Sequence, residues 1–284
     1  MTPPEIERPA AAAFDEAEVR HLKPPALTGS TGLTRRRFLR NALWITPLAG
    51  FADAAIVEPS WLSVRTLRRT ESQPRHRFVH FTDVHYKGDP GPLRTVVARI
   101  NQLKPDFACF TGDLIEHARD LPAAVEMLSE LKVPLYAVPG NHDLWSHARL
   151  GMIEEVCVAT GGAWLPNRQV SIADGAVELI GIERLPARFQ TRPDAFNLLL
   201  VHYPSWSRQL GDQQCDLILA GHTHGGQVRV PFYGSLITPS HTDGYDLGHF
   251  DTPGGPLYVN PGIGTLGKFE FRFNCRPELT VFEV

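Results

Sequence analysis

The stretch LILAGHTHGGQ, residues 217–227, places an apolar run directly before two histidines that glycines flank. The run has the length and composition of a short buried strand, and Gly221 permits a tight turn at its end. A single threonine separates His222 from His224. Their imidazoles could be metal ligands, a proton-handling pair or solvated loop residues, and other strand ends in the chain decide among these alternatives.

Four further polar clusters follow apolar runs in the same way. The runs cover residues 77–81, 106–110, 134–138 and 196–201, and the clusters after them are Asp83-Val84-His85, Gly112-Asp113, Gly140-Asn141-His142-Asp143 and His202. Apolar residues at helical spacing over 92–103 and 121–131 separate the first three runs. Strand and helix thus alternate, and α/β sheets build their sites at the strand ends.

The second half of the chain is richer in strands. We expect them at 169–173, 177–182, 196–201, 217–220, 257–259 and 279–284. Two packed sheets with helices outside are the simplest architecture for this order, which is of the α/β class. Residues 70–284 contain no linker, so the sequence predicts one catalytic domain over residues 55–284.

The residue types at these strand ends suit a centre of two divalent metal ions. Side chains two apart on an extended chain point to one side, so Asp83 and His85 can bind a single ion. Asp113 has two carboxylate oxygens and can bridge two ions. Amide and imidazole ligands complete the set, from Asn141, His202, His222 and His224. Mixed nitrogen and oxygen ligands favour Mn, Fe, Zn or Co over Ca or Cu(I).

The charge of such a centre indicates what it binds. Two divalent ions bring four positive charges, and Asp83, Asp113 and a bridging hydroxide remove three of them. The remaining positive charge favours an anionic phosphate group and the charge that develops at phosphorus during its transfer.

Together these motifs resemble the signature of the calcineurin-like metallophosphoesterase superfamily, over residues 75–284. The resemblance implies a four-layer α/β sandwich of two mixed β-sheets flanked by helices, with the dinuclear site at the strand C-terminal ends. By motif position, the first metal takes Asp83, His85, Asp113 and His224, and the second takes Asp113, Asn141, His202 and His222. His142 would be the non-ligand catalytic histidine near the leaving group, hydrogen-bonded to Asp143. Glu116, where many members have Asp, is a departure outside the ligand positions.

Closer similarity to the exported bacterial YaeI/YkuE-like phosphodiesterase branch lies in residues 56–62, in GHTHGGQ and in residues 261–264 leading to Arg272. The resemblance implies hydrolysis of a phosphodiester or pyrophosphate bond by a metal-bridging hydroxide, on a lipid- or nucleotide-linked substrate. A phosphomonoesterase of the same fold is the alternative, and a non-catalytic metal-binding regulator is a second. Arg272 is a candidate contact to a substrate anion, with a structural ion pair as its alternative.

The N-terminal part of the chain resembles a bacterial twin-arginine export signal. Residues 1–33 are expected to be flexible, and residues 34–54 contain TRRRFLR, a short apolar segment and the cleavage pattern Ala52-Asp53-Ala54. The apolar segment of about ten residues is too short to span a membrane. We expect export to the periplasm or the outer face of the cytoplasmic membrane, with the export machinery as a partner and peripheral membrane association. The alternative is a cytoplasmic protein with a basic amphipathic start.

Composition argues against two other classes of protein. The formal net charge is -3 at pH 7 and no basic patch interleaves with aromatic residues, so nucleic acid is not an expected partner. The four cysteines, Cys109, Cys157, Cys215 and Cys275, are far apart and form no CxxC pair. We therefore expect small buried side chains there, and neither a zinc site nor a disulfide framework.

Overall fold

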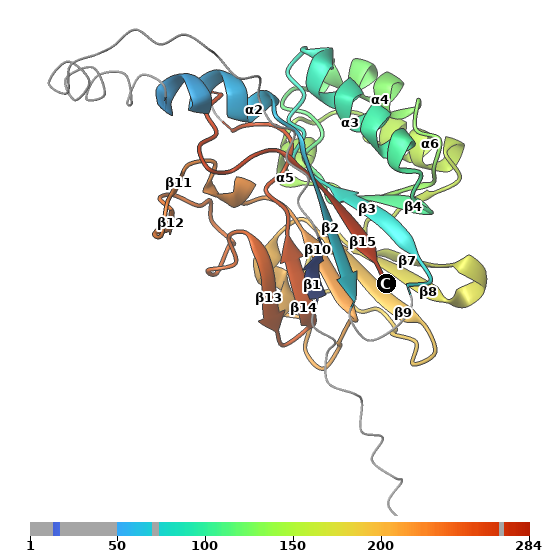
Figure 1. Ribbon diagram of the computed structural model, residues 1–284. Helices are drawn as coiled ribbons and strands as arrows, with labels where there is room; N and C mark the ends of the chain where they lie inside the picture. The colour runs from blue at the N-terminus through green and yellow to red at the C-terminus, as the bar shows by residue number, and fades with distance from the viewer. Residues whose placement is uncertain (1–13, 18–49, 70–73, 267–269) are drawn as a thin grey trace, which may run out of the picture.

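The computed structural model describes residues 14–17, 50–69, 74–266 and 270–284. Two mixed β-sheets lie face to face (Figure 1). The first has the strand order β1-β2-β15-β3-β4-β5-β6, and the second has the order β13-β14-β10-β9-β8-β7. The predicted α/β fold of two packed sheets is confirmed.

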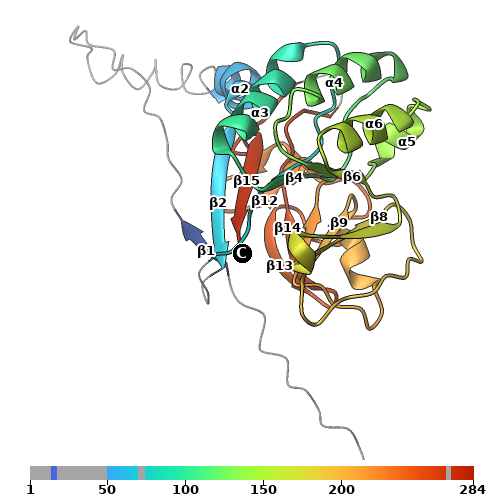
Figure 2. The ribbon, with the colours of Figure 1, turned by 90° about the vertical axis from the view of Figure 1, so that its right-hand side faces the viewer.

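The first sheet carries the three long helices on its outer face, as Figure 2 shows. Its strands are β1 (Phe14–Ala17), β2 (Ser63–Arg69), β3 (Arg77–Phe81), β4 (Phe107–Phe110), β5 (Leu135–Ala137), β6 (Ala163–Trp164) and β15 (Glu278–Glu283). The helices are α3 (Pro90–Leu103), α4 (Leu121–Leu128) and α6 (Gly151–Ala159). Leu93, Val96, Val97 and Ile100 of α3 are buried at helical spacing, so this face of the helix packs on the sheet.

The second sheet is covered differently on its outer face. Its strands are β7 (Arg168–Ile172), β8 (Val177–Ile182), β9 (Phe196–Val201), β10 (Leu217–Ala220), β13 (Gly248–Thr252) and β14 (Gly255–Val259). Trp206 in the 3-10 helix η4 (Pro204–Arg208), together with Leu185 and Phe189 in a loop, packs over it. The fourth layer is therefore a short 3-10 helix with loops, at the place where the resemblance implied flanking helices.

The two sheets are joined by a core of large side chains. Phe78, Phe107 and Tyr136 of the first sheet form one buried cluster with Leu198 and Leu217 of the second. The Phe78 ring stacks on Phe107 at a centroid distance of 5.0 Å. Within each sheet the central strands are parallel, including β3, β4 and β5 in the first and β8, β9 and β10 in the second. Their C-terminal ends therefore share one edge of each sheet.

Strands β2 and β13 and helix α6 are elements that the sequence did not indicate. β2 contains Arg65, Arg68 and Arg69, a composition that gives no apolar alternation. It is a strand because Ser63–Arg68 pair in parallel with β15, and tertiary pairing overrides local propensity in such cases.

The N-terminal region meets the domain at two places. Within the segment 1–33, which is predicted to be flexible, Phe14–Ala17 pairs antiparallel with the open edge of β2. The rest of that segment and residues 34–49, with the arginines of the predicted signal, lie outside the described residues. Residues 50–60 are helical, including η1 (Asp53–Val57) and α2 (Glu58–Ser60), so the predicted boundary after residue 54 falls within a helical stretch. In the described part of the chain, no helix has both the length and the apolar character that a membrane span requires.

Candidate metal centre

Five strand ends from the two sheets deliver the predicted ligands to one place. Asp83 and His85 follow β3, Asp113 follows β4, and Asn141 begins the short helix α5 (Asn141–Trp145) after β5. From the second sheet, His202 follows β9, and His222 and His224 follow β10. All seven side chains are buried, and the structure brings them together in two neighbouring groups.

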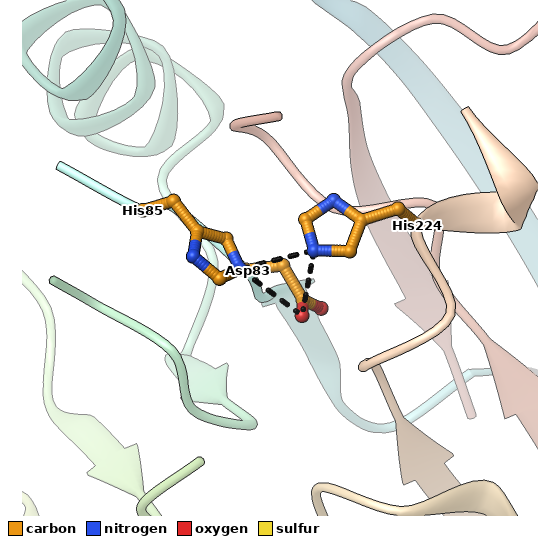
Figure 3. Close-up of side chains that lie close together, drawn as sticks. All are labelled: Asp83, His85 and His224. Carbon is orange, nitrogen blue, oxygen red and sulfur yellow. Dashed lines mark hydrogen bonds and ion pairs between the residues drawn. The ribbon is translucent and has the colours of Figure 1, made fainter. Parts of the chain in front are cut away.

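The first group consists of Asp83, His85 and His224, whose side chains point toward one another (Figure 3). His224 Nε2 lies 3.0 Å from His85 Nε2 and 3.4 Å from Asp83 Oδ1. His85 Nε2 lies 3.8 Å from the same carboxylate oxygen. The three ligand atoms thus surround one point, as they would around an ion.

The second group consists of Asp113, His202 and His222, with Asn141 beside it. His202 Nε2 lies 3.2 Å from Asp113 Oδ2 and 3.0 Å from Asn141 Oδ1. Asp113 Oδ2 is also 3.5 Å from His85 Nε2 in the first group. Asp113 therefore lies between the two groups, at the position that a ligand shared by two ions requires.

The outer hydrogen bonds of the histidines fix which nitrogen faces the centre. Carbonyl and carboxylate oxygens only accept, so Nδ1–H of His202 donates to Thr111 O at 2.7 Å and Nε2–H of His222 donates to Ser240 O at 2.8 Å. His85 Nδ1 pairs in the same way with Glu116 Oε1 at 2.9 Å. In the neutral ring, the other nitrogen then turns a lone pair toward carboxylate and amide oxygens. The imidazole nitrogens and the carboxylate and amide oxygens that face the centre are all acceptors, which suits the binding of divalent cations. Hydrogen bonds on the outer side of the rings commonly orient metal-binding histidines.

The electrostatics of the two groups also favour a cation. Burial opposes a charge on His85, yet Asp83, Glu116 and Asp113 outweigh it and raise the pKa of His85 to about 10. Burial likewise opposes the charge on His202, and Asp113 raises its pKa to about 9. Burial would raise the pKa of Asp83, but the imidazoles of His224 and His85 hold it below the ordinary value. The carboxylates thus stay ionised and hold positive charge between them.

The backbone at the centre is strained. Asp83, His85, Asp113, His222 and His224 all have positive φ, between 45° and 71°. Non-glycine residues adopt this region at a cost, and such conformations cluster at functional sites. A Cβ on Gly140 would meet the Asp113 side chain, and one on Gly221 would meet Thr82 and Asp83. Glycine at these two positions lets the ligand loops pack directly against one another.

The partner of His142 differs from the expected one. His142 Nδ1 lies 2.9 Å from Glu116 Oε2, and the other oxygen of Glu116 binds His85. Asp143 instead accepts the backbone N–H groups of Asp113 at 2.8 Å and Gly140 at 3.0 Å. The predicted His142–Asp143 pair is thus corrected, because the Asp143 side chain turns inward to hold two ligand loops together. Burial and the nearby Asp113 charge raise the pKa of Asp143 to about 6.

Glu116 is a site residue whose role could not be predicted from the sequence. The sequence feature that could have pointed to it is its position three residues after Asp113, where this chain has Glu and many family members have Asp. Burial alone would raise its pKa, but the hydrogen bonds from His142 and His85 hold the pKa of Glu116 well below the ordinary value. One ionised carboxylate therefore connects a predicted metal ligand with the predicted catalytic histidine.

Arg272 does not lie where a substrate anion could reach it. Its side chain is fully buried, and Nη1 donates to Cys275 O at 3.0 Å while Nη2 donates to Pro261 O at 2.9 Å and also to Gly264 O. The prediction that Arg272 contacts a substrate anion is therefore wrong. The alternative, a structural ion pair, is not found either, because the guanidinium group donates to backbone carbonyl groups. Arg272 ties residues 261–264 to the segment 272–275.

Comparison with known proteins gives a consistent result. The family described as calcineurin-like phosphoesterase matches residues 76–226. The metallophosphoesterase YkuE of Bacillus subtilis is 31% identical over 283 residues, covering 88% of this chain and 97% of its own. Phosphodiesterase YaeI of Escherichia coli is 31% identical over 271 residues, covering 89% and 99%. Among solved structures, TT1561 of Thermus thermophilus is 15% identical with a TM-score of 0.44, covering 66% of this chain and 90% of that chain.

Proposed function

This chain belongs to the calcineurin-like phosphoesterase family, and on that premise we propose that it hydrolyses a phosphodiester or pyrophosphate bond. The general activity of the family is metal-dependent hydrolysis of a phosphoester, and the kind of phosphoester bond is the part that we propose. The observation that carries the proposal is the pair of ligand groups on either side of Asp113, with His142 beside them. We assign Asp83, His85, Asp113 and His224 to one ion, and Asp113, Asn141, His202 and His222 to the other.

The ions would supply, when bound, the Lewis acidity that activates water and neutralises the phosphoryl oxygens. Either Mn, Fe, Zn or Co would suit these ligands. The protein's own contribution is position, since buried ligands on five strand ends fix where a phosphoryl group can lie. No side-chain nucleophile is required from the chain.

His142 is the residue that we assign to the leaving group. Its Nδ1–H donates to Glu116, so Nε2 is the nitrogen that can approach a substrate oxygen. The ring is partly exposed, in contrast to the buried ligand imidazoles. Glu116 balances positive charge on the ring while Nε2 carries a proton, and a histidine placed in this way can protonate the departing oxygen.

The carboxylates near the centre favour a diester over a monoester. Two divalent ions would bring four positive charges, and Asp83, Asp113, Glu116 and the bridging hydroxide together would bring four negative charges. With Glu116 counted, no positive charge is left over to hold the second negative charge that distinguishes a phosphomonoester from a phosphodiester. The similar protein YaeI, which is named a phosphodiesterase, agrees with this preference. A lipid- or nucleotide-linked substrate is part of the same proposal, and a phosphomonoesterase is the alternative.

Hydrolysis of a substrate panel tests the proposal. The protein is loaded with Mn, Zn or Fe and assayed with bis-p-nitrophenyl phosphate, p-nitrophenyl phosphate and UDP-diacylglucosamine. We expect higher kcat/KM for the diester or the pyrophosphate than for the monoester. Faster turnover of the monoester would support the alternative, and a protein that binds two metals without any turnover would be a regulator.

We also propose that the chain is exported through the twin-arginine route, on the basis of TRRRFLR and the apolar residues after it. A reporter fused to residues 1–60 should leave the cytoplasm, and changing Arg35 and Arg36 to Lys should retain it there. Unchanged localisation of the doubly substituted fusion would favour the cytoplasmic alternative.

A further inference from the structure

A hairpin beside the metal centre presents apolar side chains to the solvent. The apolar hairpin, residues 230–237, contains the turn between β11 (Arg229–Val230) and β12 (Gly234–Ser235). Four of its side chains are far more exposed than apolar groups normally are: Phe232 at 111%, Tyr233 at 77%, Leu236 at 57% and Ile237 at 79%. Residues 231–240 contain no charged residue. A contiguous exposed apolar patch of this kind marks an interaction surface.

The helical residues 50–60 extend this surface. Phe51, Ile56 and Val57 are exposed there, and the Phe51 ring lies 5.2 Å from that of Phe271. The next two residues along, 272 and 273, connect the helix to the hairpin. Arg272 N donates to Ala54 O at 2.9 Å, and Phe273 O accepts from Arg229 N at 2.9 Å. Figure 1 shows the helix, β11 and β12 on the same side of the molecule.

Both ends of the hairpin segment are attached to the metal centre. On one side, only four residues separate His224 from Arg229, whose Nη1 donates to Gly225 O at 2.8 Å. On the other side, Ser240 O accepts the hydrogen bond from His222 at 2.8 Å. The hairpin therefore projects from the loop that carries two of the predicted ligands, and whatever binds its tip lies close to the centre.

We propose that the apolar hairpin, together with Phe51, Ile56 and Val57, docks on the surface of a phospholipid bilayer. Aromatic and aliphatic side chains on an uncharged protrusion insert at the boundary between head groups and acyl chains. In the chain that keeps its predicted signal uncleaved, the residues immediately before Phe51 have the complementary character for such a surface, because residues 42–48 are mainly apolar and Arg35, Arg36, Arg37 and Arg40 precede them. Arginines next to an apolar segment are attracted by anionic head groups.

Docking in this orientation would hold the metal centre at the level of the head groups, where the phosphoesters of a bilayer lie. This consequence for the substrate rests on the proposed function, whereas docking itself requires no catalysis. A bilayer also fits the shape of the surface better than a second copy of the chain does. A projecting turn has little area to offer to another folded protein, but it can enter a fluid layer.

Co-sedimentation of the full chain with vesicles tests the proposal. Vesicles of phosphatidylcholine alone and of phosphatidylcholine with phosphatidylglycerol are compared, with Phe232→Ser/Tyr233→Ser and Leu236→Ser/Ile237→Ser as separate double variants. We expect the affinity of each variant for vesicles to be lower than that of the original chain by about tenfold or more. The loss should be similar on both kinds of vesicle, because the hairpin carries no charge. Val158→Ser, at an exposed position on α6, is the control and should bind as the original chain does.

The thermal midpoint and metal content of each variant show whether it is folded, since the replaced side chains are exposed. Binding of the original chain to neither kind of vesicle would overturn the proposal. Equal binding by the original chain and both variants would also overturn it and would assign all membrane affinity to the arginine-rich segment. A dimer in solution that the hairpin variants dissociate, without vesicle binding, would assign the surface to a second copy. None of these results depends on phosphoesterase activity, so each leaves the proposed function standing.

Discussion

Glu116 Oε2 and His142 Nδ1 lie 2.9 Å apart, and the second oxygen of the same carboxylate lies 2.9 Å from Nδ1 of His85. The rings of the two histidines meet edge to face at 4.7 Å. A single side chain thus sets the orientation of a predicted metal ligand and of the predicted acid. Glutamate is long enough to contact both rings from the loop that also carries Asp113.

Replacing Glu116 by Gln tests this double contact. The amide can accept from only one Nδ1–H group and presents an N–H group to the other, so one imidazole should lose its orientation. We expect kcat to fall by about 10- to 100-fold, the range for residues that orient metal-binding histidines. Metal content and initial rates are measured together, with Glu126→Gln on the exposed face of α4 as the matched control. If Glu116→Gln keeps full activity, the bridge is structural only.

Replacing His142 by Ala separates catalysis from metal binding. We expect kcat to fall by about 10²- to 10⁴-fold, the usual contribution of a general acid or base, while both metals stay bound. A substrate with a good leaving group, such as bis-p-nitrophenyl phosphate, should be affected less than one with an alkoxide leaving group, because it needs less protonation. Loss of one metal per chain would instead show that His142 is a ligand. The metal content is measured for this reason, because His142 lies near His85 and Asp113.

Replacing Asp143 by Asn should destabilise the fold, in contrast to the His142 variant. Its carboxylate accepts N–H groups from Asp113, Leu114 and Gly140, and an amide group cannot accept all of them. Each buried donor left unpaired costs about 1–3 kcal/mol. We therefore expect the free energy of unfolding to drop by about 2 kcal/mol or more, with weaker metal binding. Denaturant titration of Asp143→Asn against the exposed Asp212→Asn measures this, and equal midpoints would contradict the assigned role.

Most of the fold and the ligand set could be predicted because both follow from strand ends. Apolar runs of four to six residues identify buried strands, and β8, β9 and β10 begin and end where the pattern places them. The roles of Asp143 and Glu116 could not be predicted in this way. Both are acids within a few residues of a predicted ligand, and which of them faces His142 depends on the folded backbone, where Asp143 accepts N–H groups from Asp113 and Gly140 while Glu116 reaches the histidine.

The burial of Arg272 was likewise beyond what the sequence could indicate. Arginine is rarely buried without a carboxylate partner, and the side chain was expected either at the site or in an ion pair. Its actual partners are carbonyl oxygens in residues 261–264 and 275. Every residue has a backbone carbonyl group, so the residue types in the sequence cannot reveal such partners.

Replacing Arg272 by Met tests whether this side chain acts on the fold or on the substrate. Methionine fills part of the volume but donates no hydrogen bond, so the carbonyl groups of Cys275, Pro261 and Gly264 lose a buried donor. We expect the free energy of unfolding to fall by about 3 kcal/mol or more. Thermal unfolding and initial rates are measured on the same preparation, with Arg168→Met on the exposed face of β7 as control. Because Arg272 holds the segment next to Ala54, the variant should lose stability without a selective rise in KM for anionic substrates. A raised KM at unchanged stability would restore the substrate contact.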